Sequence, residues 1–154
     1  MNIFQTKNEF ALAIPRLVLG IVFFAHGAQK MLGWFGGAGF GGTMHFFEGM
    51  GIPALFAFLA ILAEFLGSLG LILGFLSRIA AFGIAVNMLV AIAKVHAANG
   101  FFMNWAGNQK GEGFEYHLLV LAIAAQVMIA GAGAASLDWF IYRKTSYSRV
   151  PKSA

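Results

Sequence analysis

The sequence predicts an all-α membrane protein, an antiparallel bundle of four transmembrane helices that forms a single domain over residues 1–154. Hydrophobic residues make up 60% of the chain and charged residues 10%, whereas a soluble domain has about 25% charged residues. Several apolar stretches also approach the roughly 20 residues that a helix needs to cross a bilayer. Short connections leave room for one domain only. The expected spans are 10–32, 53–76, 79–98 and 116–135, with a polar tail at 138–154.

The first span, 10–32, follows two residues that favour a helix start. Asn8 and Glu9 can accept hydrogen bonds from free backbone N–H groups and complement the positive end of the helix. A lysine before an apolar run is also typical of a signal peptide, but Pro15 and Arg16 interrupt this run early. No convincing cleavage site follows, so we expect a retained first span.

The connection at 33–52 alternates glycines with aromatic residues such as Trp34 and Phe35. Glycine permits tight turns, and aromatic rings favour the headgroup level of a bilayer. The segment is therefore expected to lie on the membrane surface or to re-enter it, with a short amphipathic turn at 44–50. Its glycines do not form a dinucleotide fingerprint, because no strand precedes them.

The second and third spans are expected to form a helical hairpin. Pro53 suits the first turn of the helix at 53–76. The turn to the span at 79–98 contains little more than Ser77 and Arg78, so the two helices must run antiparallel. A longer polar loop at 98–115 leads to the last span.

The distribution of basic residues predicts the orientation in the membrane. Cytoplasmic loops carry an excess of lysine and arginine. The side of both termini carries six such residues near span ends, and the side of the two long loops carries three, so both termini are expected in the cytoplasm. The first set is Lys7, Arg78, Arg143, Lys144, Arg149 and Lys152, and the second is Lys30, Lys94 and Lys110.

Ionisable side chains inside apolar spans are the first candidates for a functional site, because a charge is costly in hydrocarbon. With the predicted orientation, these groups concentrate in the outer half of the bundle. The ligand-binding candidates are His26, Lys30, Glu64, Lys94 and Glu115, the supporting polar residues are Arg16, Asn87 and Gln126, and weaker candidates are His96 and His117.

Helical phase places most of these groups on one face of each helix. At about 100° per residue, Lys94 shares a face with Asn87, and Glu115 shares one with Gln126. The two amides could alternatively form hydrogen bonds between helices. Glycines on the polar stripe of the first span permit close helix approach; this stripe contains Arg16, Gly20, Phe23, Gly27 and Lys30.

The charged candidates also have purely structural interpretations. Lys30 and Lys94 could extend toward the membrane interface. Glu64 lies near the midplane of its span, so it is either paired inside the bundle or protonated, because burial disfavours the charged form. Its expected partner is Arg16, followed by Lys30 or Lys94.

A metal site or a covalently bound cofactor is not predicted. The two weaker histidines, His96 and His117, point away from Lys94 and Glu115 in helical phase, and no two histidines have the i, i+4 spacing of a ligand pair. The chain contains no cysteine, which removes thiolate sites and dithiol chemistry. The cations form no stripe or motif that indicates nucleic-acid binding.

Several segments resemble the DoxX family, in the same order and over essentially the whole chain. They include the opening of the first span, Glu64 ahead of Gly67 and Gly70, and the junction between the second and third spans. The matching segments read PRLVLGIVFFAHGAQK at 15–30, LGFLSRIAA at 73–81, KVHAANGFF at 94–102, GFEY at 113–116 and GAGAASLD at 131–138.

The resemblance implies a small four-helix protein of the bacterial inner membrane, associated with oxidoreductase subunits and with quinone. In a quinone-linked redox subunit, His26, Lys30 and Lys94 could donate hydrogen bonds to quinone oxygens, and Glu64 and Glu115 could carry protons. The alternatives are a non-enzymatic scaffold or assembly factor of an oxidoreductase complex, and a small-solute permease. The sequence leaves open whether the chain is catalytic at all.

Overall fold

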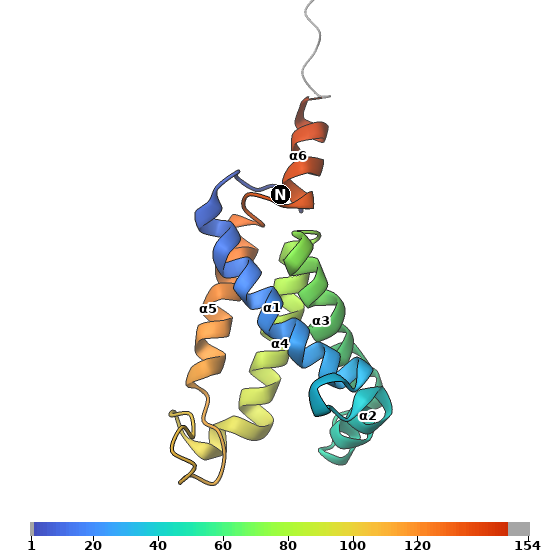
Figure 1. Cartoon of the computed structure of the whole chain (residues 1–154), viewed down its shortest axis with the longest axis vertical. Helices are drawn as coiled ribbons and strands as arrows, with labels where there is room; N and C mark the ends of the chain where they lie inside the picture. Colours follow the sequence, from blue (N-terminus) through green and yellow to red (C-terminus); the bar gives the residue numbers. More distant parts are fainter. Residues whose placement is uncertain (1, 148–154) are drawn as a thin grey trace, which may run out of the picture.

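The computed structural model describes residues 2–147, and all regular elements among them are helices (Figure 1). The apolar helices α1, α3, α4 and α5 pack into a bundle in which α1 and α4 each contact both α3 and α5. The all-α prediction is therefore confirmed. The bundle helices are α1 (Phe10–Leu32), α3 (Ala54–Leu73), α4 (Ser77–Ala91) and α5 (Glu115–Ala130), and the shorter helices are α2 (Gly39–Gly49) and α6 (Leu137–Tyr147).

Three of the described helices are long and apolar enough to cross a membrane, which makes the chain a membrane protein. They are α1, α3 and the continuous helical segment Ser77–Asn99. That segment begins as α4 and continues through a π-helical turn, η2 (Ile92–His96), and a 3-10 turn, η3 (Ala97–Asn99). The fourth apolar helix, α5, has 16 residues and is shorter than these spans, so a fourth crossing stays a prediction.

The fourth apolar run does not remain helical to residue 135. Helix α5 ends at Ala130, because Gly131 and Gly133 adopt left-handed backbone angles with φ of 89° and 79°. The segment that follows is irregular but largely buried, with Ala132 and Ala134 almost fully covered. Irregular backbone is tolerated at membrane depth where protein covers it and satisfies its polar groups.

The predicted polar tail is helical over 138–147 and, with Leu137, forms α6. This helix projects from the end of the bundle at which the chain begins, called the terminal end below (Figure 1). The Ser136 hydroxyl accepts a hydrogen bond from the Trp139 N–H at 3.2 Å and so caps the helix. The Asp138 carboxylate is only 1% exposed and accepts hydrogen bonds from the N–H groups of Leu76 and Ser77, at 2.8 and 2.9 Å. Asp138 thereby anchors α6 to the start of α4. The predicted cations Arg149 and Lys152 lie outside the described residues.

The glycine-rich connection between the first two spans is more ordered than a surface loop. It forms a 3-10 turn, η1 (Trp34–Gly36), and then α2, which starts at Gly39 and includes most of the amphipathic turn expected at 44–50. Phe35 and Phe46 remain exposed on these two elements. Figure 1 shows α2 beside the end of α1 and the start of α3, which it connects. The start of α5 lies on the other side of the bundle, with the end of α4.

Close contact between α1 and α3 depends on Gly27, as the glycine stripe predicted. A Cβ atom at this position would lie 2.7 Å from the Phe65 Cα atom and 2.8 Å from the Glu64 carbonyl carbon. Both neighbours are backbone atoms of α3, so the helices could accept a side chain only by moving apart. The absence of a Cβ atom therefore places the last turns of α1 directly against Glu64.

The variant Gly27→Ala is expected to lower the free energy of unfolding by about 1–3 kcal/mol, the usual range for overpacking a dense core. The matched control is Gly67→Ala on α3, where a new Cβ atom would make an ordinary contact of 3.6 Å with the Ala80 carbonyl oxygen. The control should gain up to about 1 kcal/mol, because alanine is the better helix former. Thermal unfolding of the detergent-solubilised protein compares the two. Equal melting temperatures would contradict the close approach of α1 and α3.

Candidate functional site

A buried ion pair joins α1 and α3. The Lys30 ammonium donates a hydrogen bond to Glu64 Oε2, and the Glu64 residue is 6% exposed. The Lys30 side chain is 28% exposed, so the Lys30 side of the pair is less deeply buried than the Glu64 side. Pairing inside the bundle is what the midplane position of Glu64 predicted, with Lys30 as partner rather than the first choice, Arg16.

Arg16 does not pair with Glu64 because it lies roughly 20 Å further along the α1 axis than Lys30. It is completely buried near the terminal end of the bundle. There its guanidinium donates to backbone carbonyl groups at the end of α3 and in the segment after α5. The acceptors are Ala132 at 2.7 Å, Ile72 at 3.1 Å, Ala134 and Ala135 at 3.2 Å each, and Leu71.

Tyr116 on α5 contributes a further buried polar group to the bundle, although it was absent from the predicted site. Its hydroxyl group is buried and has no hydrogen-bond partner among the described residues. A tyrosine at the start of an apolar span is normally interpreted as an interface anchor. The sequence therefore contained no signal that distinguished Tyr116 from an anchor.

Two histidine rings from different helices lie in contact at a tilted angle. The ring centroids of His96 on η2 and His117 on α5 are 4.1 Å apart with an interplanar angle of 44°. His96 Nδ1 lies 2.8 Å from the Glu112 carbonyl oxygen, which matches donation by an Nδ1–H group. His117 is buried, and its Nδ1 atom has no partner among the described residues. Phase within each helix could not predict this contact, because it arises between helices.

The remaining ligand-binding candidates have separate surroundings. The Glu115 carboxylate accepts hydrogen bonds from the Met103 N–H at 2.9 Å and the Trp105 Nε1–H at 3.4 Å, so it orders the loop before α5. Lys94 is exposed and forms no ion pair with a described carboxylate. His26 is also exposed, with its ring 6.3 Å from that of Phe23. Of the five candidates, the structure thus brings only Lys30 and Glu64 into contact.

The two uncharged candidates differ in role. The Asn87 amide donates to the Ala60 carbonyl oxygen at 2.8 Å and so links α4 to α3. This is the hydrogen bond between helices that was the alternative interpretation of this residue. Gln126 is half-buried on α5 and forms no hydrogen bond with another described residue. Within residues 2–147, no group of three histidine, cysteine or acidic side chains is arranged to hold a metal ion.

Comparison with known proteins identifies similar chains in several bacteria. The candidate oxidoreductase CatD of Bacillus subtilis is 28% identical over 135 residues, which cover 88% of this chain and 90% of CatD. The inner membrane protein YqjF of Escherichia coli is 28% identical over 138 residues, or 89% of this chain and 96% of YqjF. An uncharacterised protein of Haemophilus influenzae is 32% identical over 151 residues, or 94% and 100% of the two chains.

No solved structure matches the chain. The family model of DoxX matches residues 11–97, from the start of α1 to η3. The matched region includes Arg16, Lys30, Glu64 and the glycine contact between α1 and α3, and it ends before Tyr116. Together with the full-length similarity to the Haemophilus influenzae protein, this match shows that the chain belongs to the DoxX family.

Proposed function

We propose that this DoxX-family membrane protein is a quinone-linked redox subunit of the bacterial cytoplasmic membrane. The observation that supports the proposal is the Lys30–Glu64 ion pair, buried between apolar helices of a bundle that also holds the unpartnered Tyr116 hydroxyl. Buried polar groups normally have partners, so this combination of groups is suited to a polar ligand head that enters from the lipid. A quinone combines such a head with an apolar tail.

The chemistry of the site follows from the needs of quinone reduction. A quinone that accepts two electrons also takes up two protons and becomes a hydroquinone. The Lys30 ammonium and the Tyr116 hydroxyl can donate hydrogen bonds to the quinone oxygens, and the Glu64 carboxylate can take up and release a proton. The electrons would come from an associated oxidoreductase subunit, because this chain has no cysteine with which to carry them as a dithiol.

The names of two relatives support this assignment. CatD is named as a candidate oxidoreductase, and YqjF is named as an inner membrane protein. The excess of lysine and arginine near the terminal side favours cytoplasmic termini. With that orientation, the Lys30–Glu64 pair lies in the half of the membrane that faces away from the cytoplasm.

Binding of a soluble short-chain quinone to the purified protein tests the proposal. Isothermal titration calorimetry in neutral detergent should show a dissociation constant raised about tenfold by Tyr116→Phe, the effect of one lost hydrogen bond. This variant removes only a hydroxyl group and keeps the ion pair, so the bundle should remain folded. Lys30→Met should weaken binding at least as much, and the exposed control Lys94→Met should leave it unchanged. Equal affinity in the wild type, Tyr116→Phe and Lys30→Met would refute the site.

A non-enzymatic scaffold is the second candidate, and two arginines favour it. Arg78 donates to the Met128 and Ile129 carbonyl oxygens at the end of α5 and to the Gln5 carbonyl oxygen before α1. Together with Arg16, it fastens the terminal end of the bundle. A rigid end suits docking of another subunit, and this function would need no quinone. Absence of quinone binding in the wild type, with the fold intact, would favour the scaffold.

A further inference from the structure

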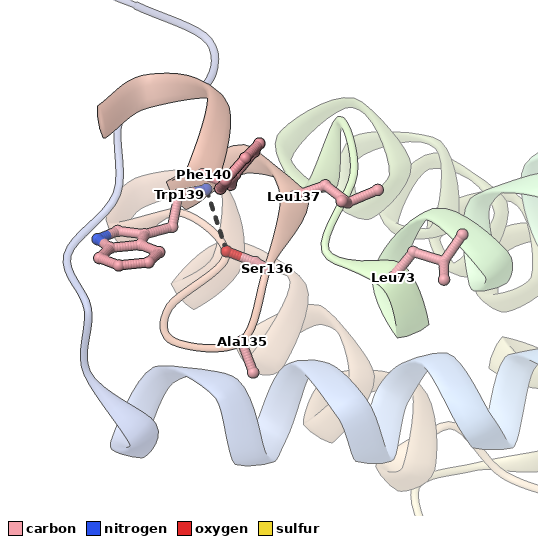
Figure 2. Close-up of a pocket in the computed structure, with 6 residues that line it drawn as sticks. All are labelled: Leu73, Ala135, Ser136, Leu137, Trp139 and Phe140. Carbon is pink, nitrogen blue, oxygen red and sulfur yellow. Dashed lines mark hydrogen bonds between the residues drawn. The ribbon is translucent and has the colours of Figure 1, made fainter. Parts of the chain in front are cut away.

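An open groove lies where α3 ends and α6 leaves the bundle (Figure 2). Its volume is about 500 Å³, and its lining is mainly apolar. Leu73 is the last residue of the membrane-spanning helix α3, so the groove begins at the level where an apolar span ends. Leu137 and Phe140 on α6 are 45% and 50% exposed. The lining residues are Leu73, Ala135, Ser136, Leu137, Trp139 and Phe140.

Both aromatic residues of the groove carry a cation on their rings. The Lys144 Nζ atom lies 4.4 Å from the centroid of the Phe140 ring, and the Arg143 Cζ atom lies 5.5 Å from the centroid of the Trp139 ring. Neither cation forms an ion pair with a described carboxylate. The acidic residue of α6, Asp138, is occupied by the backbone N–H groups at the start of α4. Within residues 2–147, no acidic side chain therefore neutralises the positive charge beside the groove.

A second groove lies on the same end of the molecule. It has a volume of about 550 Å³ and includes Tyr142 of α6 in its lining. Lys7, Glu9 and Arg78 also contribute to that lining, and the Lys7 ammonium lies 3.7 Å from a Glu9 carboxylate oxygen. Helix α6 thus borders two grooves, and the cations of the second groove, unlike the two beside the first, have carboxylate or carbonyl partners in the protein.

We propose that the α6 groove binds an anionic phospholipid. One acyl chain would lie along Leu73, Leu137 and Phe140, and the phosphate would lie between Arg143 and Lys144. The apolar lining and the positive charge together favour this ligand. A soluble anion would not cover the apolar surface, and a zwitterionic lipid would be attracted less strongly by the two cations. A basic segment at the cytoplasmic end of a span attracts anionic lipid, so the site is also consistent with cytoplasmic termini.

Fluorescence quenching by brominated lipids can test this site directly. The chain has three tryptophans, and the background variant Trp34→Phe/Trp105→Phe leaves only Trp139, which lines the groove. In neutral detergent at low salt, brominated phosphatidylglycerol should quench Trp139 at lower concentration than brominated phosphatidylcholine. Arg143→Gln/Lys144→Gln should reduce this preference by about fivefold for each cation removed. Lys94→Gln/Lys110→Gln removes the same charge from the opposite end of the bundle and should preserve it.

Three results would overturn the proposal. The first is equal quenching by the two lipids, and the second is an unchanged preference in Arg143→Gln/Lys144→Gln. The third is loss of the preference on addition of 10 mM inorganic phosphate at constant ionic strength, which would identify a site for soluble anions. Both substituted side chains are exposed, so the variant should elute in gel filtration as the wild type does. The lipid site is independent of the proposed quinone site, because the two use different residues and different ends of the bundle.

Discussion

Arg16→Met is expected to destabilise the bundle more than any other single change considered. The guanidinium is completely buried and donates to the carbonyl oxygens of Ala132, Ala134 and Ala135, which accept no other hydrogen bond from described residues. Ala132 and Ala134 are buried, whereas Ala135 is exposed. A buried polar group without a partner costs about 1–3 kcal/mol, so the loss from the two buried carbonyl groups should be about 2–6 kcal/mol. The upper end of this range is comparable to the whole stability of some domains. Thermal unfolding in neutral detergent should show a large drop in melting temperature, or no folded protein should accumulate.

Two further variants make the role of Arg16 specific. Arg16→Lys keeps the charge but cannot reach carbonyl groups in several directions at once, because lysine lacks the planar fork of donors. It should fall between the wild type and Arg16→Met. The control Arg143→Met removes an arginine from the exposed surface of α6, and its effect should stay near 0.5–1 kcal/mol, the range for an exposed cation–π contact. A melting temperature for Arg16→Met within 2 °C of the control would show that the carbonyl groups find other partners.

Glu64→Gln should produce the second largest effect, because it leaves the Lys30 ammonium without a counter-charge between α1 and α3. Removal of one partner of a buried ion pair costs about 3–5 kcal/mol. Partial exposure of Lys30 places the expected loss near the lower limit, at about 3 kcal/mol. Urea or detergent-mixture unfolding, followed by circular dichroism, measures this difference. The control Glu112→Gln changes a carboxylate that accepts a hydrogen bond from the Asn104 N–H at 2.6 Å in an exposed loop, and about 1 kcal/mol is expected there.

The double variant Lys30→Met/Glu64→Met separates the ion pair from simple packing. Apolar residues of similar volume often replace a buried ion pair without loss of stability. The double variant should therefore be more stable than Glu64→Gln, although it should lose quinone binding. If the double variant were less stable than either single variant, the two side chains would contribute independently, and the ion pair would not account for their position.

Local sequence properties determined the class of the protein and the path of its main helices. Apolar composition and run length predicted a membrane protein, since transfer of apolar side chains into lipid depends on the residues and not on their neighbours. The observed start and end of α1 match the predicted span. The connection between α3 and α4 is short enough to impose a hairpin, but it lies at residues 74–76, because Ser77 and Arg78 already belong to α4. The contact at Gly27 was also predictable, because close packing of helices in lipid requires small residues at regular spacing.

Tertiary structure alone decided which polar groups meet. Helical phase identifies the face of a residue, but the depth of one helix relative to another depends on the packing of all side chains between them. That packing pairs Lys30 with Glu64 and brings the Arg16 guanidinium to the carbonyl groups after α5. It also brings the rings of His96 and His117 into contact. The same packing stabilises the irregular backbone after Ala130, because Arg16 donates to the buried carbonyl groups of Ala132 and Ala134. Such partners lie far apart in the chain, so the residue pattern of a single helix cannot predict which of them meet.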